Sequence, residues 1–110
     1  MPDILMVFCT FPDLEKARLV SSVLIESGLA ACVNLCPGIE SIYCWQNRVE
    51  SHSEVLAIFK TTAMAYPAFE SRLRELHLYD IPEIVAMRPE QVSETYAKWV
   101  TASVLVDSLV

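Results

Sequence analysis

The side chains in this sequence that are best suited to chemistry are thiols and imidazoles. They are few, namely Cys9, Cys32, Cys36, Cys44, His52 and His77. Thiolate and imidazole are donors that copper prefers, but no two cysteines have the Cys-x-x-Cys spacing of zinc and redox motifs. The chain also has no Gly-x-Ser-x-Gly elbow, no phosphate-binding glycine loop and no dinucleotide fingerprint. The sequence therefore predicts a binding protein rather than an enzyme.

The chain is acidic, with 8 Lys and Arg against 14 Asp and Glu and a formal net charge of −6. Nucleic acids and anionic membranes bind basic patches, and the basic residues here are scattered, so neither partner is expected. The apolar run 4–9 is too short for the core of a signal peptide, and no stretch approaches the ~20 apolar residues that span a bilayer. We therefore expect a cytoplasmic protein whose cysteines are free thiols.

The length of 110 residues suits a single domain over residues 1–110. Hydrophobic residues make up 54% of the chain, slightly more than the roughly 45–50% of an ordinary soluble protein. A domain this small has too little interior to bury all of that apolar surface. The excess predicts burial against other subunits, and the alternative is a monomer with a more apolar surface.

Hydrophobic spacing predicts an alternation of strands and helices. Strands are expected over 4–10, 31–36, 39–45, 48–50, 54–60 and 83–88, and helices are expected to open near Asp13, after Thr61 or Thr62, and after Ser93. The strand at 54–60 is either separate or a continuation of the return arm of the preceding hairpin. Two β-α-β units separated by a hairpin predict an α+β, ferredoxin-like βαββαβ sandwich with an added hairpin and a C-terminal helix.

The predicted turns depend on a few residues that tolerate unusual backbone angles. Gly28 follows a helical stretch, where a left-handed residue is favourable only for glycine. Pro37-Gly38 predicts a turn between two apolar runs, and Gln46-Asn47 predicts a tight hairpin, because asparagine tolerates a positive φ.

Five long motifs stand out, namely SGLAACVN at 27–34, PGIESIYCWQ at 37–46, IFKTT at 58–62, RELHLY at 74–79 and IPEIVA at 81–86. These motifs resemble those of the CutA divalent-cation tolerance family. Their order and spacing match the family over roughly residues 4–105. The resemblance implies a ferredoxin-like fold in a tight homotrimer, related in architecture to the PII signalling trimers. It also implies an association with divalent metals and no established reaction.

The resemblance also implies a candidate copper site. Where such a site is described in the family, its ligands are a cysteine late in the first strand and an adjacent pair of histidines. Cys9 matches the cysteine and His77 matches the second histidine, but Leu76 stands in place of the first. Copper or another divalent cation is therefore expected to bind through Cys9 and His77 with one ligand missing. The alternative is that Cys9 is a packed strand residue and His77 a residue at the end of a helix.

A second candidate site consists of Lys60, Tyr79 and Glu83, which lie on family motifs at the ends of predicted elements. An ammonium, a phenol and a carboxylate that meet in a cleft between subunits would bind a small polar ligand. The alternative is a structural salt bridge with the tyrosine packed beside it. Tyr43 and Trp45 on the hairpin are expected to anchor an interface between subunits.

Two functions follow from these observations. The first is a homotrimer that binds a divalent metal, copper in particular, and acts in metal tolerance or homeostasis. The second is a PII-like sensor or scaffold trimer that binds a small anionic metabolite in the cleft between subunits.

Overall fold

A computed structural model describes residues 3–105 of the chain. Its elements in order are β1 (Ile4–Phe11), α1 (Leu14–Glu26), β2 (Cys32–Trp45), β3 (Arg48–Thr62), α2 (Tyr66–Leu76), β4 (Ile84–Met87) and α3 (Glu94–Ser103). The predicted α+β class and the order of the elements are confirmed. No helix within residues 3–105 is both long and apolar enough to cross a membrane.

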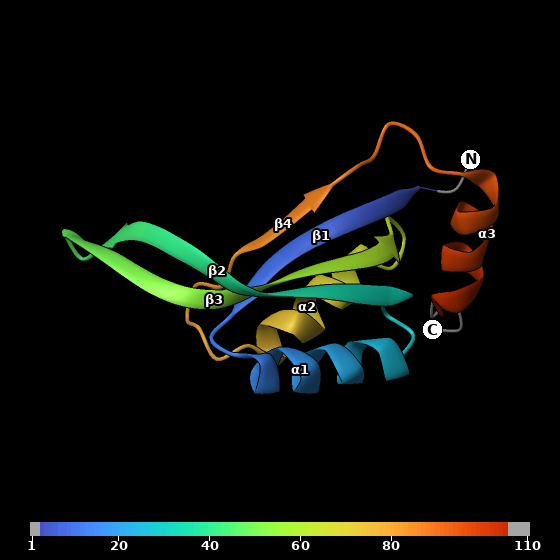
Figure 1. The fold of residues 1–110 in the computed structure, drawn as a ribbon. Helices are drawn as coiled ribbons and strands as arrows, with labels where there is room; N and C mark the ends of the chain where they lie inside the picture. Colours follow the sequence, from blue (N-terminus) through green and yellow to red (C-terminus); the bar gives the residue numbers. More distant parts are fainter. Residues whose placement is uncertain (1–2, 106–110) are drawn as a thin grey trace.

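The four strands form one antiparallel sheet in the order β2-β3-β1-β4. Helices α1 and α2 cover one face of this sheet, and α3 stands at the end where the described chain begins and finishes (Figure 1). The residues buried between the sheet and α1 and α2 include Val7, Cys9, Ala17, Leu24, Ala57, Phe59, Phe69 and Leu73. A smaller cluster of Ile4, Ala65, Ala97, Val100 and Val104 attaches α3.

The hairpin is not an addition to the sheet, as the sequence suggested, but an extension of its two longest strands. Strand β2 has 14 residues and β3 has 15, and both continue beyond the helices (Figure 1). Gln46 and Asn47 form the predicted tight turn with φ angles of 52° and 65°. The turn predicted at Pro37-Gly38 is wrong, because β2 runs through these residues with a register shift between Cys36 and Ile39. Proline lacks an N–H and is accepted at such an irregularity on an edge strand.

The expected first residues of α1 and α3 are confirmed by their capping bonds. The carboxylate of Asp13 accepts a hydrogen bond of 2.8 Å from a backbone N–H in the first turn of α1, and the hydroxyl of Ser93 does the same for α3 at 3.3 Å. The expected cap of α2 is correct in its hydrogen bond but not in its position, because the hydroxyl of Thr62 accepts a hydrogen bond of 3.2 Å from the N–H of Ala65 in the turn that leads into the helix. Both Thr61 and Thr62 lie within β3, and α2 has Ala65 at its N-cap with no side-chain hydrogen bond there.

Gly28 lies in the turn between α1 and β2 and contacts the segment that follows α3. Its φ is +74°, and its carbonyl accepts a hydrogen bond of 2.7 Å from the N–H of Leu105. A Cβ atom at position 28 would lie 2.6 Å from Cγ of Leu105, a separation that side chains do not tolerate. The sequence predicted the left-handed angle, and the structure adds a close approach of the C-terminal segment.

We expect Gly28→Ala to destabilise the protein more than Gly38→Ala. Both glycines have a positive φ, so both substitutions should cost roughly 1–2 kcal/mol of backbone strain. A Cβ at Gly38 meets nothing within 4 Å, whereas at Gly28 it must also displace Leu105. Urea unfolding of both variants at one protein concentration measures the difference. Equal losses of stability would show that Leu105 moves aside without cost.

Candidate functional site

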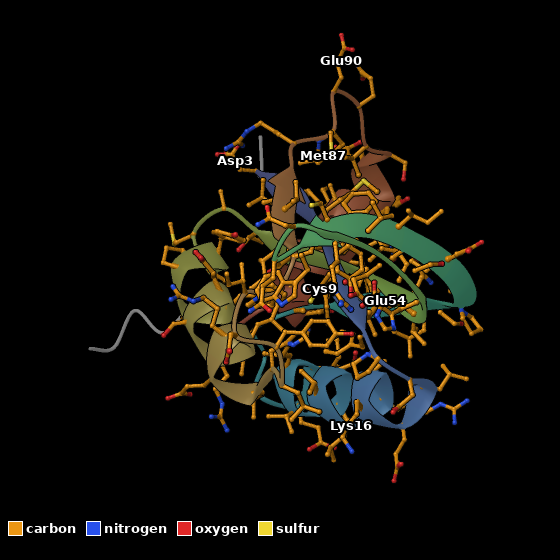
Figure 2. All side chains as sticks on the ribbon, turned by 90° about the vertical axis from the view of Figure 1, so that its left-hand side faces the viewer. Asp3, Cys9, Lys16, Glu54, Met87 and Glu90 are labelled. Atoms are coloured by element: carbon orange, nitrogen blue, oxygen red, sulfur yellow. The ribbon has the colours of Figure 1, made fainter. Side chains whose placement is uncertain are left out.

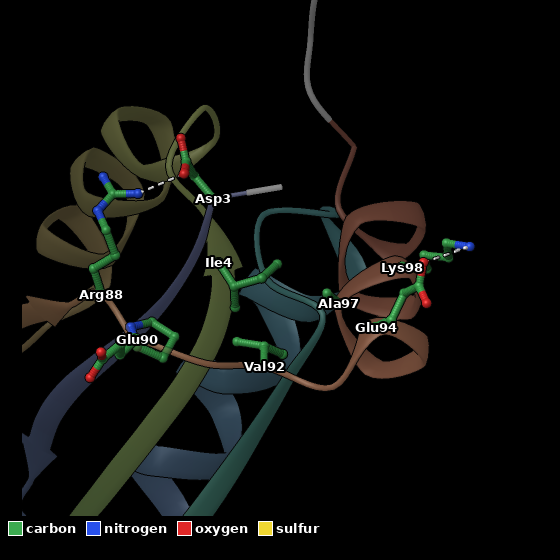
Figure 3. A pocket seen from close by; sticks show the side chains of 9 residues that line it. Asp3, Ile4, Arg88, Glu90, Val92, Glu94, Ala97 and Lys98 are labelled. Atoms are coloured by element: carbon green, nitrogen blue, oxygen red, sulfur yellow. Dashed lines mark ion pairs between the residues drawn. The ribbon is translucent and has the colours of Figure 1, made fainter. Parts of the chain in front are cut away.

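Pockets of ligand size lie at both ends of the sheet. The pocket beside α3 has a volume of about 520 Å³, and four of the charged side chains around it are paired (Figure 3). Arg88 lies 2.9 Å from Asp3, and Lys98 lies 3.6 Å from Glu94. The second pocket, of about 780 Å³, lies at the base of the β2–β3 hairpin. We call it the hairpin pocket.

The hairpin pocket combines aromatic rings with acidic side chains. Strands β2 and β3 and the loop between α2 and β4 supply most of its wall. Its lining residues are Thr10, Pro12, Ser41, Ile42, Tyr43, Trp45, His52, Ser53, Glu54, Tyr79, Asp80, Ile81 and Glu83. Three of them are carboxylates and none is a lysine or an arginine. The charge of the pocket is therefore negative.

Glu54 is the most deeply buried carboxylate of this pocket, with 9% of the residue exposed. Its Oε2 accepts a hydrogen bond of 2.6 Å from the hydroxyl of Tyr79. Burial, followed by this hydrogen bond, raises the pKa of Tyr79, so the phenol remains a neutral donor. Within residues 3–105, Glu54 has no basic side chain within 4.0 Å to balance its charge.

His77 attaches the loop after α2 to the end of β1. Its Nε2 lies 2.8 Å from the carbonyl oxygen of Thr10, and its Nδ1 accepts a hydrogen bond of 3.1 Å from the N–H of Tyr79. The imidazole also stacks on Phe11 at a ring separation of 4.7 Å. Burial lowers the pKa of His77 and outweighs the Thr10 carbonyl and the Glu54 charge, which raise it. A neutral ring with its proton on Nε2 satisfies both contacts.

Cys9 lies in the core behind the hairpin pocket and is fully buried. Figure 2 looks onto the hairpin end and shows Cys9 and Glu54 near the middle of the molecule. Burial, with the nearby carboxylates of Glu83 and Glu54, raises the pKa of Cys9 to about 12. A metal ligand must be the thiolate, and this environment strongly favours the thiol.

The predicted copper ligands do not fit a metal ion in their present arrangement. Both nitrogens of His77 already have hydrogen-bonding partners, and burial raises the pKa of Cys9, which disfavours the thiolate that a metal ion binds. Over residues 3–105, no group of three or more His, Cys, Asp or Glu side chains could hold a metal ion. Leu76, at the position of the missing ligand, is half-buried and packs against the core.

The second predicted set is only partly brought together. Tyr79 and Glu83 line the hairpin pocket, but Lys60 lies six residues beyond Glu54 on β3, a separation of about 20 Å. Lys60 donates a hydrogen bond to Oδ1 of Asn34, and it makes no ion pair within the described part of the chain. The expected convergence therefore does not occur within one chain. A cleft between subunits that includes Lys60 stays a prediction.

Glu54 was not predicted from the sequence, although one signal pointed to it. Glu54 stands between the polar segment 51–53 and the apolar run 55–59. A charged residue at such a boundary lies where a strand enters the core. The sequence could not reveal its hydrogen bond to Tyr79, because the two residues are 25 positions apart.

A family model described as "CutA1 divalent ion tolerance protein" matches residues 5–103. The chain belongs to this family. It is 43% identical over 94 residues to the divalent-cation tolerance protein CutA of Thermus thermophilus. This match covers 86% of this chain and 91% of that protein. It is 40% identical over 93 residues to human CutA, but that match covers 84% of this chain and 52% of the human protein.

Solved CutA structures share the fold. The crystal structure of CutA from Xylella fastidiosa has a TM-score of 0.91 and 36% identity, covering 94% of this chain and 99% of that chain. The structure of CutA1 from Thermus thermophilus has a TM-score of 0.89 and 39% identity, and the match covers 93% of this chain and 99% of that chain. The resemblance inferred from the sequence motifs is thereby confirmed. The names of the family and of its Thermus thermophilus member describe tolerance of divalent ions and mention no reaction.

We expect the stability of this CutA protein to fall in mild acid because of His77. Burial lowers the pKa of His77 in the folded state. In the unfolded chain the imidazole has its ordinary pKa near 6.5, so below that pH the unfolded chain binds more protons than the folded one. His77 then stabilises the fold above pH 6.5 and loses this contribution as the pH falls below it, by at most about 1.4 kcal/mol per pH unit. Urea unfolding between pH 5 and 7.5 should show a smaller fall for His77→Gln than for the wild type.

The matched control is His52→Gln, which removes the other histidine and leaves His77 in place. As the pH is lowered, the stability of His52→Gln should fall as steeply as that of the wild type. A His77→Gln variant with the wild-type pH dependence would contradict the role of the buried imidazole.

Proposed function

We propose that this protein acts in the tolerance of divalent cations as a cytoplasmic homotrimer that catalyses no reaction. The main support is membership of the CutA1 divalent ion tolerance family over residues 5–103. The relatives differ in location, since their names include chloroplastic and periplasmic forms. The cytoplasmic location rests on the sequence alone.

The uncovered face of the sheet supports the homotrimer. In this sheet, the residues that face away from α1 and α2 include Met6, Phe8, Leu56, Ile58, Val85 and Met87, which the register places in adjacent rows. We call them the open face. Val85 and Met87 are 49% and 54% exposed, and the other four are half-buried. An apolar sheet face of this kind needs a covering layer, and α3 covers only the end near Ile4.

A closed ring of identical subunits would supply that layer. Strands β2 and β4 lie at the edges of the sheet, and an edge strand offers free backbone groups for pairing with another chain. Tyr43 and Trp45 on the hairpin are 43% and 46% exposed and add aromatic contact area. Closed symmetry satisfies all copies of such a surface at once.

We expect Val85→Arg to dissociate the trimer. The substitution places a charge in the open face, where burial against another subunit would leave it unpaired. Light scattering at micromolar concentration should give about 37 kDa for the wild type, three chains of 12.4 kDa, and about 12 kDa for the variant. The control is Leu19→Arg, because Leu19 is 63% exposed on α1, away from the open face. A wild type near 12 kDa would refute the trimer, and a trimeric Val85→Arg would place the interface elsewhere.

We further propose that copper binding by this chain is weak. Binding at Cys9 must remove a proton from a buried thiol whose pKa is about 12, and binding at His77 must displace a backbone hydrogen bond of about 3 Å. Leu76 offers no donor in place of the missing histidine. The relatives' names support an association with divalent cations.

Chelator competition should show a copper affinity that rises by about tenfold per pH unit near neutrality, because one thiol proton is released for each ion bound. Cys9→Ser and His77→Ala should each weaken binding, and Leu76→His should tighten it by adding an imidazole. Wild-type affinity in both deletion variants would mean that copper binds elsewhere. An unchanged affinity in Leu76→His would mean that the side chains at 9, 76 and 77 do not converge.

A further inference from the structure

We propose that a second copy of this chain completes the hairpin pocket, and that Lys60 of that copy forms an ion pair with Glu54. The inference rests on the homotrimer proposed above and assigns one contact between its subunits. The pocket has a volume of about 780 Å³ in a single chain, enough for a lysine side chain to enter. Its occupant is then part of the assembly rather than a free ligand.

Glu54 and Lys60 lie at opposite ends of one row of side chains on β3. Alternate residues of a strand point to the same face, so both share a face with Leu56 and Ile58, which belong to the open face. Glu54 lines the hairpin pocket, whereas Lys60 lies two residue pairs from Ile4, which contacts α3. The row therefore has an acid at one end, a base at the other and apolar residues between them. Within one chain the two charged residues are about 20 Å apart.

The hairpin end of the row carries an excess of negative charge. Glu54 is 9% exposed, and the pocket that it lines also contains Asp80 and Glu83 but no lysine or arginine. The hydroxyl of Tyr79, a neutral donor, makes the hydrogen bond to Glu54. A carboxylate that assembly buries further is costly unless a cation pairs with it. An apolar surface alone would therefore be a poor cover for this pocket.

Lys60 supplies the opposite charge on the same face of the sheet. It is half-buried, and within residues 3–105 it donates to the neutral amide of Asn34 and makes no ion pair. Its neighbours on the open face are apolar, so assembly through that face would bury the ammonium as well. A buried lysine needs a carboxylate partner, and the acidic hairpin pocket of another copy offers one.

The other basic side chains are less suited to this role. Four already have acidic partners, namely Arg72, Arg74, Arg88 and Lys98. Arg48 follows the hairpin turn. Lys16 and Arg18 lie on α1, which covers the opposite face of the sheet (Figure 1).

A closed ring of three copies can bring the two ends of the row together. In such a ring every contact joins two different parts of the chain, one from each neighbour. If the end of β3 that carries Lys60 meets the hairpin pocket of the next copy, each of the three Glu54 carboxylates gains one ammonium. The charge of both ends is then neutralised without any change within the chain.

NMR with selectively labelled lysine tests this contact without altering the interface. The sequence has three lysines, at positions 16, 60 and 98, and Lys60→Arg identifies the signal of Lys60 by its loss. In the full-length trimer with ¹³C-labelled lysine, we expect a nuclear Overhauser effect between the ε-methylene of Lys60 and the ring protons of Tyr79. Tyr79 is bonded to Glu54, which is about 20 Å from Lys60 along β3. A signal between them must therefore come from two copies.

A double-mutant cycle measures the strength of the pair. Sedimentation gives the trimer dissociation constant of Glu54→Gln, Lys60→Gln and the double variant at the urea concentration that half-dissociates the wild type. Each single substitution should weaken assembly, and the two effects should fall short of multiplying by about tenfold per interface, the lower range for close charge pairs between proteins. Residues more than roughly 10 Å apart normally act independently, so such coupling indicates contact between copies.

The matched control is the cycle of Glu54→Gln with Lys16→Gln. It makes the same chemical change on a lysine of α1, and its effects should multiply. Multiplying effects for Glu54→Gln and Lys60→Gln would overturn the pair. If either variant does not fold, the labelled wild type decides.

The nuclear Overhauser effect also separates this inference from the proposed function. A protein that is trimeric by light scattering but shows no signal between Lys60 and Tyr79 would overturn the pair and leave the trimer standing. A wild type near 12 kDa, the mass of one chain, would refute the trimer itself and the pair with it. Neither outcome depends on copper binding at Cys9 and His77.

Discussion

The architecture depends on a mismatch in length between strands and helices. Strand β3 has 15 residues and would extend about 50 Å if it were straight. Helix α1 has 13 residues and therefore a length of only about 20 Å. The helices can cover less than half of the strand, and the burial along β3 changes at Glu54 from exposed to buried. The protruding half forms the hairpin, and the hairpin pocket lies where the covered half begins.

The same mismatch explains why the subunit has more apolar surface than its own core can bury. Two helices cover one face of the sheet, and α3 protects only one end of the other through Ile4. The rest of the open face, together with Tyr43 and Trp45 on the hairpin, remains accessible in a single chain. This location gives a structural reason for the hydrophobic excess of the sequence. Assembly would then complete the fold rather than join finished domains.

The features predicted well from sequence are those set by neighbouring residues. Asp13 and Ser93 at helix starts, and Gln46-Asn47 at the hairpin, depend on local hydrogen bonds and φ preferences. The continuous course of β2 through Pro37-Gly38 was not foreseen, because a bulge and a turn favour the same residues and only pairing with β3 decides between them.

The site was predicted less well than the fold because its contacts are distant in sequence. Family motifs led to Tyr79 and Glu83, which line the hairpin pocket, and to Cys9 and His77, which lie beside Glu83 and Thr10. They also led to Lys60, which lies elsewhere on β3. The partner of Tyr79 is Glu54, 25 residues earlier, and no local pattern encodes such a pair. Residue type alone also could not show that both nitrogens of His77 are occupied.

Metal binding at His77 would compete with the hydrogen bonds that hold the hairpin pocket together, because those bonds use both of its ring nitrogens. The imidazole holds the N–H of Tyr79 on one side and the carbonyl of Thr10 on the other, and Tyr79 in turn donates to Glu54. A metal ion that took Nε2 would have to break the bond that fixes this loop to β1, and one that took Nδ1 would have to break the bond to Tyr79 within the loop. The phenol would then lose the support that directs it to Glu54, and the buried carboxylate would lose its only donor among the described residues. Copper binding at His77 would therefore disrupt the hydrogen bonds of the hairpin pocket.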